Sequence, residues 1–136
     1  VRRELKALRG KEVVTTGDGL LATFGAPAAG IQCATAIREA VRTLGLEIRI
    51  GMHAGEYKMT GKEVIGLAIH IGARVAAKAR AGEVLVSSAV KDLMPASGIR
   101  FSDRGAHQLK GVPERWRLYR VEHAGMIRKS AKRISA

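Results

Sequence analysis

An aspartate held between two glycines is the first feature of the sequence that could do chemistry. Gly17-Asp18-Gly19 separates two short runs of apolar and β-branched residues, a composition typical of a tight hairpin turn. A carboxylate fixed in such a turn is a good oxygen ligand for Mg²⁺, and the glycines would let a phosphate chain come close. The turn can also be purely structural, because Asp-Gly is a common turn sequence. From spacing alone, both interpretations stay open.

A histidine and an arginine share one face of a predicted helix. His70 and Arg74 lie four residues apart in an Ala-rich stretch at 67–80, so both side chains could meet one ligand. Each also has an ordinary explanation, since a lone arginine on such a helix is usually solvated and a histidine can pack at a helix interface. Lys110, in a Leu-Lys-Gly segment, is either a ligand-binding lysine or a turn lysine.

Hydrophobic periodicity predicts the elements that must position these residues. Steps of three and four residues indicate helices, whereas alternation and short β-branched runs indicate strands. The predicted helices are residues 1–9, 27–44, 67–80 and 88–94. The predicted strands are residues 12–16, 20–24, 47–54, 84–86, 101–109 and 115–121, with a polar connection at 57–62. This order predicts the α+β class, and one strand added before the first helix would complete the βαββαβ pattern of ferredoxin-like folds.

The basic charge is concentrated at the two ends of the chain. Of the net charge of +12 on the 136 residues, residues 1–11 contribute +4 and residues 123–136 another +4, which leaves +4 for residues 12–122. This length suits one core. We therefore expect one domain over residues 1–122 and a basic tail over 123–136. The tail is either solvated or in contact with anionic lipid, nucleic acid or a neighbouring domain.

Two further features of the sequence indicate the cellular location of the protein. No stretch of the sequence reaches the roughly 18 uncharged apolar residues that span a bilayer, so we expect no transmembrane segment in this chain. The single Cys33 has no second cysteine with which to form a disulfide. Together these features predict a soluble, cytoplasmic domain.

Five stretches are similar, in order and with matching gaps, to bacterial class III adenylate/guanylate cyclase catalytic domains. They are residues 15–24, 46–56, 66–76, 82–87 and 109–113. The resemblance extends over roughly residues 10–121. It implies a ferredoxin-like βαββαβ cyclase core that lacks its first strand, followed by a small C-terminal β addition.

The resemblance also implies a reaction and a partner. In this family, homodimers or pseudo-dimers form nucleotide sites at their interface, and regulatory domains are attached elsewhere in the full-length protein. Two Mg²⁺ or Mn²⁺ ions bound by two aspartates activate the ribose 3′-hydroxyl of ATP, which attacks the α-phosphate and releases pyrophosphate. Asp18 matches the second metal aspartate. No residue of this chain matches the first one, which we expect upstream in the intact protein.

The remaining predicted site residues also take their roles from the resemblance. Arg74 matches the arginine that stabilises charge on the reacting phosphate, and His70 stands where many members have an asparagine that supports the transition state. Lys110 matches a lysine that contacts the triphosphate. Gly17 belongs to the substrate-binding turn.

Selection of the base departs from the family pattern. Adenylate cyclases commonly have a lysine where this sequence has Val14, and Glu63 replaces an aspartate. Glu63 could still accept a hydrogen bond from an adenine amino group, or it could be a solvated carboxylate. ATP is the expected substrate, with GTP as the alternative.

Two rival functions remain at the level of sequence. A degenerate cyclase-like domain would bind nucleotide, or only dimerise, and regulate an attached partner. A basic ferredoxin-like nucleic-acid binder would need aromatic residues exposed on its sheet, and only 4% of the residues are aromatic. We therefore expect no specific nucleic-acid partner.

Overall fold

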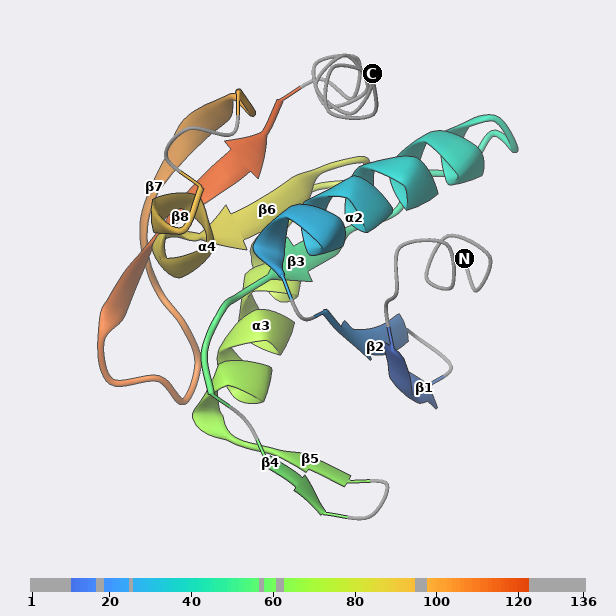
Figure 1. Cartoon of the computed structure of the whole chain (residues 1–136). Coiled ribbons are helices and arrows are strands. Elements are labelled where there is room, and N and C mark those ends of the chain that lie inside the picture. The colour runs from blue at the N-terminus through green and yellow to red at the C-terminus, as the bar shows by residue number, and fades with distance from the viewer. Residues whose placement is uncertain are drawn as a thin grey trace.

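The computed structural model describes residues 11–16, 19–24, 26–56, 58–60, 63–94 and 98–122 (Figure 1). The predicted helix at residues 1–9 and the basic tail at 123–136 lie outside the described residues. The described helices are α2 (Pro27–Arg42), α3 (Leu67–Lys78) and α4 (Ser88–Asp92). The described strands are β1 (Lys11–Thr16), β2 (Gly19–Thr23), β3 (Ile50–Met52), β4 (Lys58–Thr60), β5 (Glu63–Ile65), β6 (Val84–Ser87), β7 (Phe101–Gln108) and β8 (Arg115–Val121).

The central element is a four-stranded mixed sheet with the order β3-β6-β8-β7. β3 and β6 are parallel, because α3 carries the chain back across the sheet between them. β8 is antiparallel to both β6 and β7. The prediction of an α+β domain with two late antiparallel strands is therefore confirmed.

Helices cover both faces of this sheet. Val84 and Val86 of β6 belong to one core cluster with Ile31 and Ala34 of α2. Leu85, which points to the other face, packs in a second cluster with α3 residues such as Val75. All four residues of β6 are buried. Continuous burial explains the unbroken apolar run that predicted this strand.

Two β-hairpins lie outside the central sheet. β1 and β2 pair so that Thr16 faces Gly19, which confirms the predicted strand-turn-strand. β4 and β5 also pair with each other, so the predicted polar connection at 57–62 is wrong. The strands of this hairpin have three residues each, too few for a periodic pattern to appear in the sequence. The hairpin projects beyond α3 at the bottom of Figure 1.

The strand predicted at 47–54 is shorter than expected. Only Ile50–Met52 forms a ladder, and its partner is β6. The predicted alternation is nevertheless real, because Ile50, Met52 and Ala54 all pack against the same core cluster. Within the described residues, β3 pairs with β6 alone and β2 with β1 alone. These are the two strands between which the additional strand of a ferredoxin-like pattern would pair.

A buried ion pair fixes the chain between α3 and β6. Glu83 accepts hydrogen bonds from Arg104 Nε at 2.7 Å and Nη2 at 3.0 Å, and from the backbone N–H of Arg80 at 2.8 Å. Burial by itself would raise the pKa of Glu83, but these hydrogen bonds and the positive charge of Arg104 hold that pKa below its ordinary value. Glu83 therefore stays ionised and joins the start of β6 to β7.

The close approach of β3 to α3 depends on Gly51. A Cβ atom at this position would overlap the backbone of Ala76. Gly72, in the middle of α3, is different, since a Cβ there would lie 3.8 Å from the Cβ of His53, an ordinary contact. Only the first of these glycines is required by packing.

We predict that Gly51→Ala destabilises the protein by about 1–3 kcal/mol, because α3 must move away from the sheet. The matched variant Gly72→Ala should be neutral, or stabilising by up to about 1 kcal/mol, because alanine favours a helix. Urea unfolding of both variants measures the difference. Equal effects would contradict the proposed packing of β3 on α3.

Candidate functional site

Two of the predicted site residues meet where α3 contacts the turn between β7 and β8. His70 is partly buried on α3, and its Nε2 lies 3.0 Å from the backbone oxygen of Lys110. A carbonyl oxygen only accepts hydrogen bonds, so Nε2 must carry the hydrogen. The Lys110 side chain is exposed. The structure thus joins residues that are 40 positions apart in the sequence.

Arg74 lies one turn further along the same helix. It is partly buried, and within the described part of the chain its guanidinium has no hydrogen bond or ion pair. Some arginines do have such partners, as Arg104 has Glu83 and Arg117 has Asp103, whereas others such as Arg49 and Arg115 have no described ion pair. Arg74 and Lys110 therefore offer positive charge that no described carboxylate neutralises.

The other predicted site residues are distributed over the two hairpins. Glu63 lies in β5 opposite Thr60, and Val14 lies in β1 opposite Leu21. Gly17 and Asp18 fall between β1 and β2 and lie outside the described residues. The structure thus joins His70 to the backbone of Lys110, and Arg74 lies one turn from His70 on the same helix.

The described residues do not complete a metal site. No group of three or more His, Cys, Asp or Glu side chains lies close enough together, within the part of the chain that the structure describes, to hold a metal ion. Asp18 is the single carboxylate that the sequence assigns to such an ion. Any two-metal site would need ligands in addition to it.

The environment of His53 is not apparent from the sequence. Its Nδ1 forms a hydrogen bond of 2.6 Å with Oγ of the buried Ser87, and its ring packs edge-on against Trp116 with centroids 4.8 Å apart. Burial lowers the pKa of His53 below its ordinary value, so the neutral imidazole is favoured. Trp116 Nε1 is buried without a hydrogen-bond partner among the described residues. No local pattern could reveal these contacts, because His53, Ser87 and Trp116 lie far apart in the sequence.

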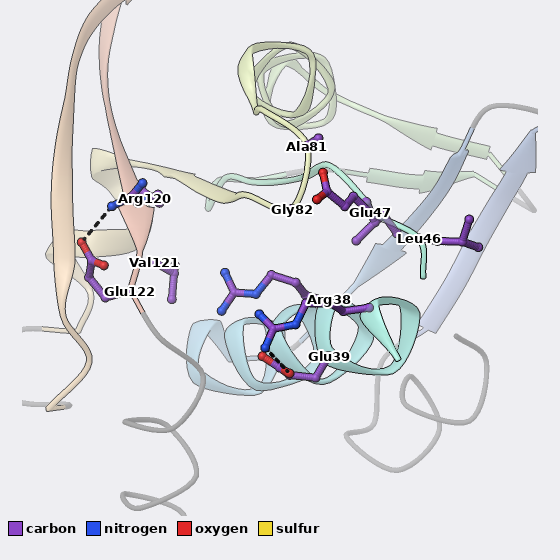
Figure 2. Close-up of a pocket in the computed structure, with 11 residues that line it drawn as sticks. Arg38, Glu39, Leu46, Glu47, Ala81, Gly82, Arg120, Val121 and Glu122 are labelled. Carbon is purple, nitrogen blue, oxygen red and sulfur yellow. Dashed lines mark ion pairs between the residues drawn. The ribbon is translucent and has the colours of Figure 1, made fainter. Parts of the chain in front are cut away.

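A cavity of about 370 Å³ lies elsewhere, between the C-terminal half of α2 and the end of β8 (Figure 2). Three arginines and three glutamates line it, and none of them is a predicted site residue: Arg38, Arg42, Arg120, Glu39, Glu47 and Glu122. Partial burial lowers the pKa of the Arg38 guanidinium below its ordinary value. Because the lining charges balance, the cavity does not favour an anion over a cation.

No helix in the described part of the chain is long and apolar enough to cross a membrane.

We predict that His53 makes stability depend on pH below about 6.5, its ordinary pKa. Above that value the imidazole is neutral in both states and its contribution is complete. As the pH falls below it, the unfolded chain binds a proton that the folded protein resists, so stability decreases by at most about 1.4 kcal/mol per pH unit. Comparing the urea unfolding of the protein and of His53→Asn between pH 7.5 and 5.5 tests this. The variant should show the flatter dependence, and equal slopes would contradict the prediction.

The chain is similar in sequence to parts of several known proteins. A Rhizobium meliloti protein, whose provisional name is adenylate cyclase 3, is 26% identical over 113 residues, which cover 76% of this chain and 19% of that protein. The serine/threonine-protein kinase pkn2 of Myxococcus xanthus is 32% identical over 123 residues, covering 85% of this chain and 15% of the kinase. The chain thus spans less than a fifth of the length of either relative. No protein-family model matches it.

Solved structures match the fold over most of the chain. An adenylate/guanylate cyclase/hydrolase from Silicibacter pomeroyi superposes with a TM-score of 0.81 and 25% identity, covering 90% of this chain and 78% of that one. The guanylate cyclase domain of RhGC from Catenaria anguillulae, solved in complex with GTP, gives a TM-score of 0.75 at 18% identity, covering 89% and 76%. In fold and over most of its sequence, the chain is therefore similar to adenylate/guanylate cyclase catalytic domains.

Proposed function

We propose that this chain is a purine nucleotide cyclase domain that converts ATP into 3′,5′-cyclic AMP and pyrophosphate. The observation that carries the proposal is the hydrogen bond that joins His70 of α3 to the Lys110 backbone, with Arg74 one turn further along the same helix. Both cations match functional positions of the family that the chain resembles. Neither has a described carboxylate partner, so their charge is available to a polyphosphate.

The reaction needs positioning and charge stabilisation more than covalent chemistry. The ribose 3′-oxygen attacks the α-phosphorus as it loses its proton, and the bond from that phosphorus to the pyrophosphate oxygen breaks. Arg74 would present its planar donors to the α-phosphate, where negative charge develops. Lys110 would act as a point charge on the rest of the triphosphate chain.

The chemistry also calls for divalent metal ions. Mg²⁺ or Mn²⁺, two per site, would lower the charge on the phosphates and favour ionisation of the 3′-hydroxyl. Asp18 suits such an ion because carboxylate oxygens are the ligands that Mg²⁺ prefers. We propose that a second aspartate from the intact protein completes the set.

ATP is the proposed substrate and GTP the alternative. Glu63 could accept a hydrogen bond from the adenine amino group, whereas Val14 offers no polar atom to a purine edge. The structure with bound GTP belongs to a domain only 18% identical, so it supports the shared fold and not the choice of base.

We further propose that two copies pair to form the active sites, with each site drawing residues from both copies. The matched regions are small parts of their relatives, which fits a catalytic domain controlled by regulatory domains in a larger protein. Since ATP is an intracellular substrate, we place the domain in the cytoplasm.

One observation favours a second candidate function, a degenerate domain that binds nucleotide or only dimerises. His70 replaces an asparagine, and its Nε2–H is already used by the Lys110 carbonyl. Only Nδ1 then remains for a substrate, and a neutral imidazole with hydrogen on Nε2 accepts at Nδ1 and does not donate.

Cyclic nucleotide formation from ATP and from GTP with Mn²⁺, in the intact protein and its variants, tests the proposal. Arg74→Ala should lower kcat by about 100- to 1,000-fold, because it removes a donor that acts on the transition state. Lys110→Ala should raise KM for ATP about tenfold through the loss of one charged contact, and Asp18→Ala should abolish turnover.

Lys78→Ala is the matched control, since this exposed lysine lies one turn beyond Arg74 on α3. It should leave both kinetic constants unchanged. A folded protein that makes no cyclic nucleotide from either substrate would overturn the cyclase proposal and support the regulatory alternative.

A further inference from the structure

The turn that carries Lys110 is fixed by the core on both sides. Leu109 and Val112 are 1% and 2% exposed, and they share a core cluster with Ile71 and Val75 of α3. The N–H of Val112 donates to the carbonyl of Leu109 at 3.0 Å, which closes the turn. Only the peptide group between the two central residues is left without support from the core.

The peptide group between Lys110 and Gly111 has the orientation of a type II turn. Gly111 has a φ of 79°, the value expected at the third position of a type II turn. In a type I turn the same residue would have a negative φ, and the central peptide would be turned over. The carbonyl of Lys110 belongs to this central peptide. Its hydrogen bond with His70 Nε2–H therefore favours the type II form.

The histidine ring also fits the turn closely. A Cβ atom on Gly111 would lie only 2.9 Å from His70 Nε2, so the ring occupies the space that a side chain would need. The hydrogen bond is compatible with both the neutral ring and the cation, because Nε2 can carry hydrogen in each. The contact thus depends on the position of one nitrogen atom and not on the charge of the ring.

From these contacts we infer that His70 is a positioning residue, whose Nε2–H holds the Lys110–Gly111 peptide and so fixes Lys110 relative to Arg74 for binding a triphosphate. The inference rests on the proposed function and differs from the family role of the residue at this position. It assigns to His70 a contact with the protein backbone in place of one with the nucleotide.

Two substitutions of His70 distinguish a contact with the backbone from a contact with the nucleotide, because their amide groups lie at different positions. The amide nitrogen of glutamine can take the place of Nε2 of histidine, whereas that of asparagine corresponds to Nδ1. His70→Gln should therefore keep the bond to the Lys110 carbonyl. His70→Asn restores the side chain common in the family but cannot reach that carbonyl in the same way.

The probe is inorganic tripolyphosphate, which has neither base nor ribose, and calorimetry measures its affinity for the intact protein. His70→Gln should bind within about threefold of the unsubstituted protein, and His70→Asn and His70→Ala about tenfold more weakly, the equivalent of one hydrogen bond. In a Lys110→Ala background, His70→Ala should cause no additional loss, because the lysine side chain that His70 positions is already absent.

Several outcomes would overturn the inference: no binding of tripolyphosphate by the unsubstituted protein, His70→Asn binding as well as His70→Gln, or additive losses in the double variant. Absence of cyclic nucleotide formation together with the expected affinity pattern would instead overturn the proposed cyclase activity alone. Thermal unfolding of each variant identifies any loss of affinity that is due to unfolding.

Gly111→Ala provides a second test that needs no ligand. Gly45 has a similar φ of 77° but no atom within 4 Å of the Cβ position, so Gly45→Ala measures backbone strain alone. Gly111→Ala should shift the urea midpoint further downwards than Gly45→Ala, because it also displaces the His70 ring. In a His70→Ala background the two shifts should become equal. A difference that persists there would show that the ring does not occupy this space.

Discussion

The structure depends on burying the four-residue strand β6 on both of its faces. Val84 and Val86 point towards α2, whereas Leu85 points towards α3, and all of these side chains are 0% exposed. A strand in this position must be apolar throughout, and each residue helps to hold a neighbouring element. The parallel pairing with β3 and the antiparallel pairing with β8 extend from it to the rest of the sheet.

This core also determines where the cationic residues lie. Ile71 and Val75 bury one side of α3 beside Leu109 and Val112, which anchor the turn between β7 and β8. His70 and Arg74 precede these two core residues in the sequence, and Lys110 lies between the two turn anchors. Packing of apolar side chains therefore brings α3, with His70 and Arg74, against the turn that carries Lys110.

Several arginines of the described chain form ion pairs with carboxylates. Arg104 is buried against Glu83, and Arg117 is bonded to Asp103 on the surface. In the α2 cavity, Arg42 and Arg120 have glutamates at 3.7 and 3.6 Å. Within the described residues, Arg74 and Lys110 lack such partners, and so do other basic residues such as Arg49, Arg100 and Arg115. A net charge of +12 is therefore in itself a poor indicator of a binding site, and the contact of His70 with the Lys110 backbone is what distinguishes this region.

The local sequence by itself determined those elements that are long enough to show a hydrophobic periodicity. The steps of three and four residues predicted α2 and α3 to within two residues at their ends, and the Asp-Gly turn predicted the β1–β2 hairpin. The i,i+4 spacing placed His70 and Arg74 on one helix face. The family resemblance then indicated which of these residues could bind a nucleotide.

Tertiary structure alone decided the contacts between segments that are distant in the chain. The three-residue strands β4 and β5 exist through their mutual pairing, and the requirement for glycine at position 51 arises from Ala76 on a later helix. In the same way, the hydrogen bond from His70 to Lys110 spans 40 residues, and sequence identified both residues without showing that they touch. Such contacts leave no local pattern, because they depend on how the core brings α3 against the β7–β8 turn.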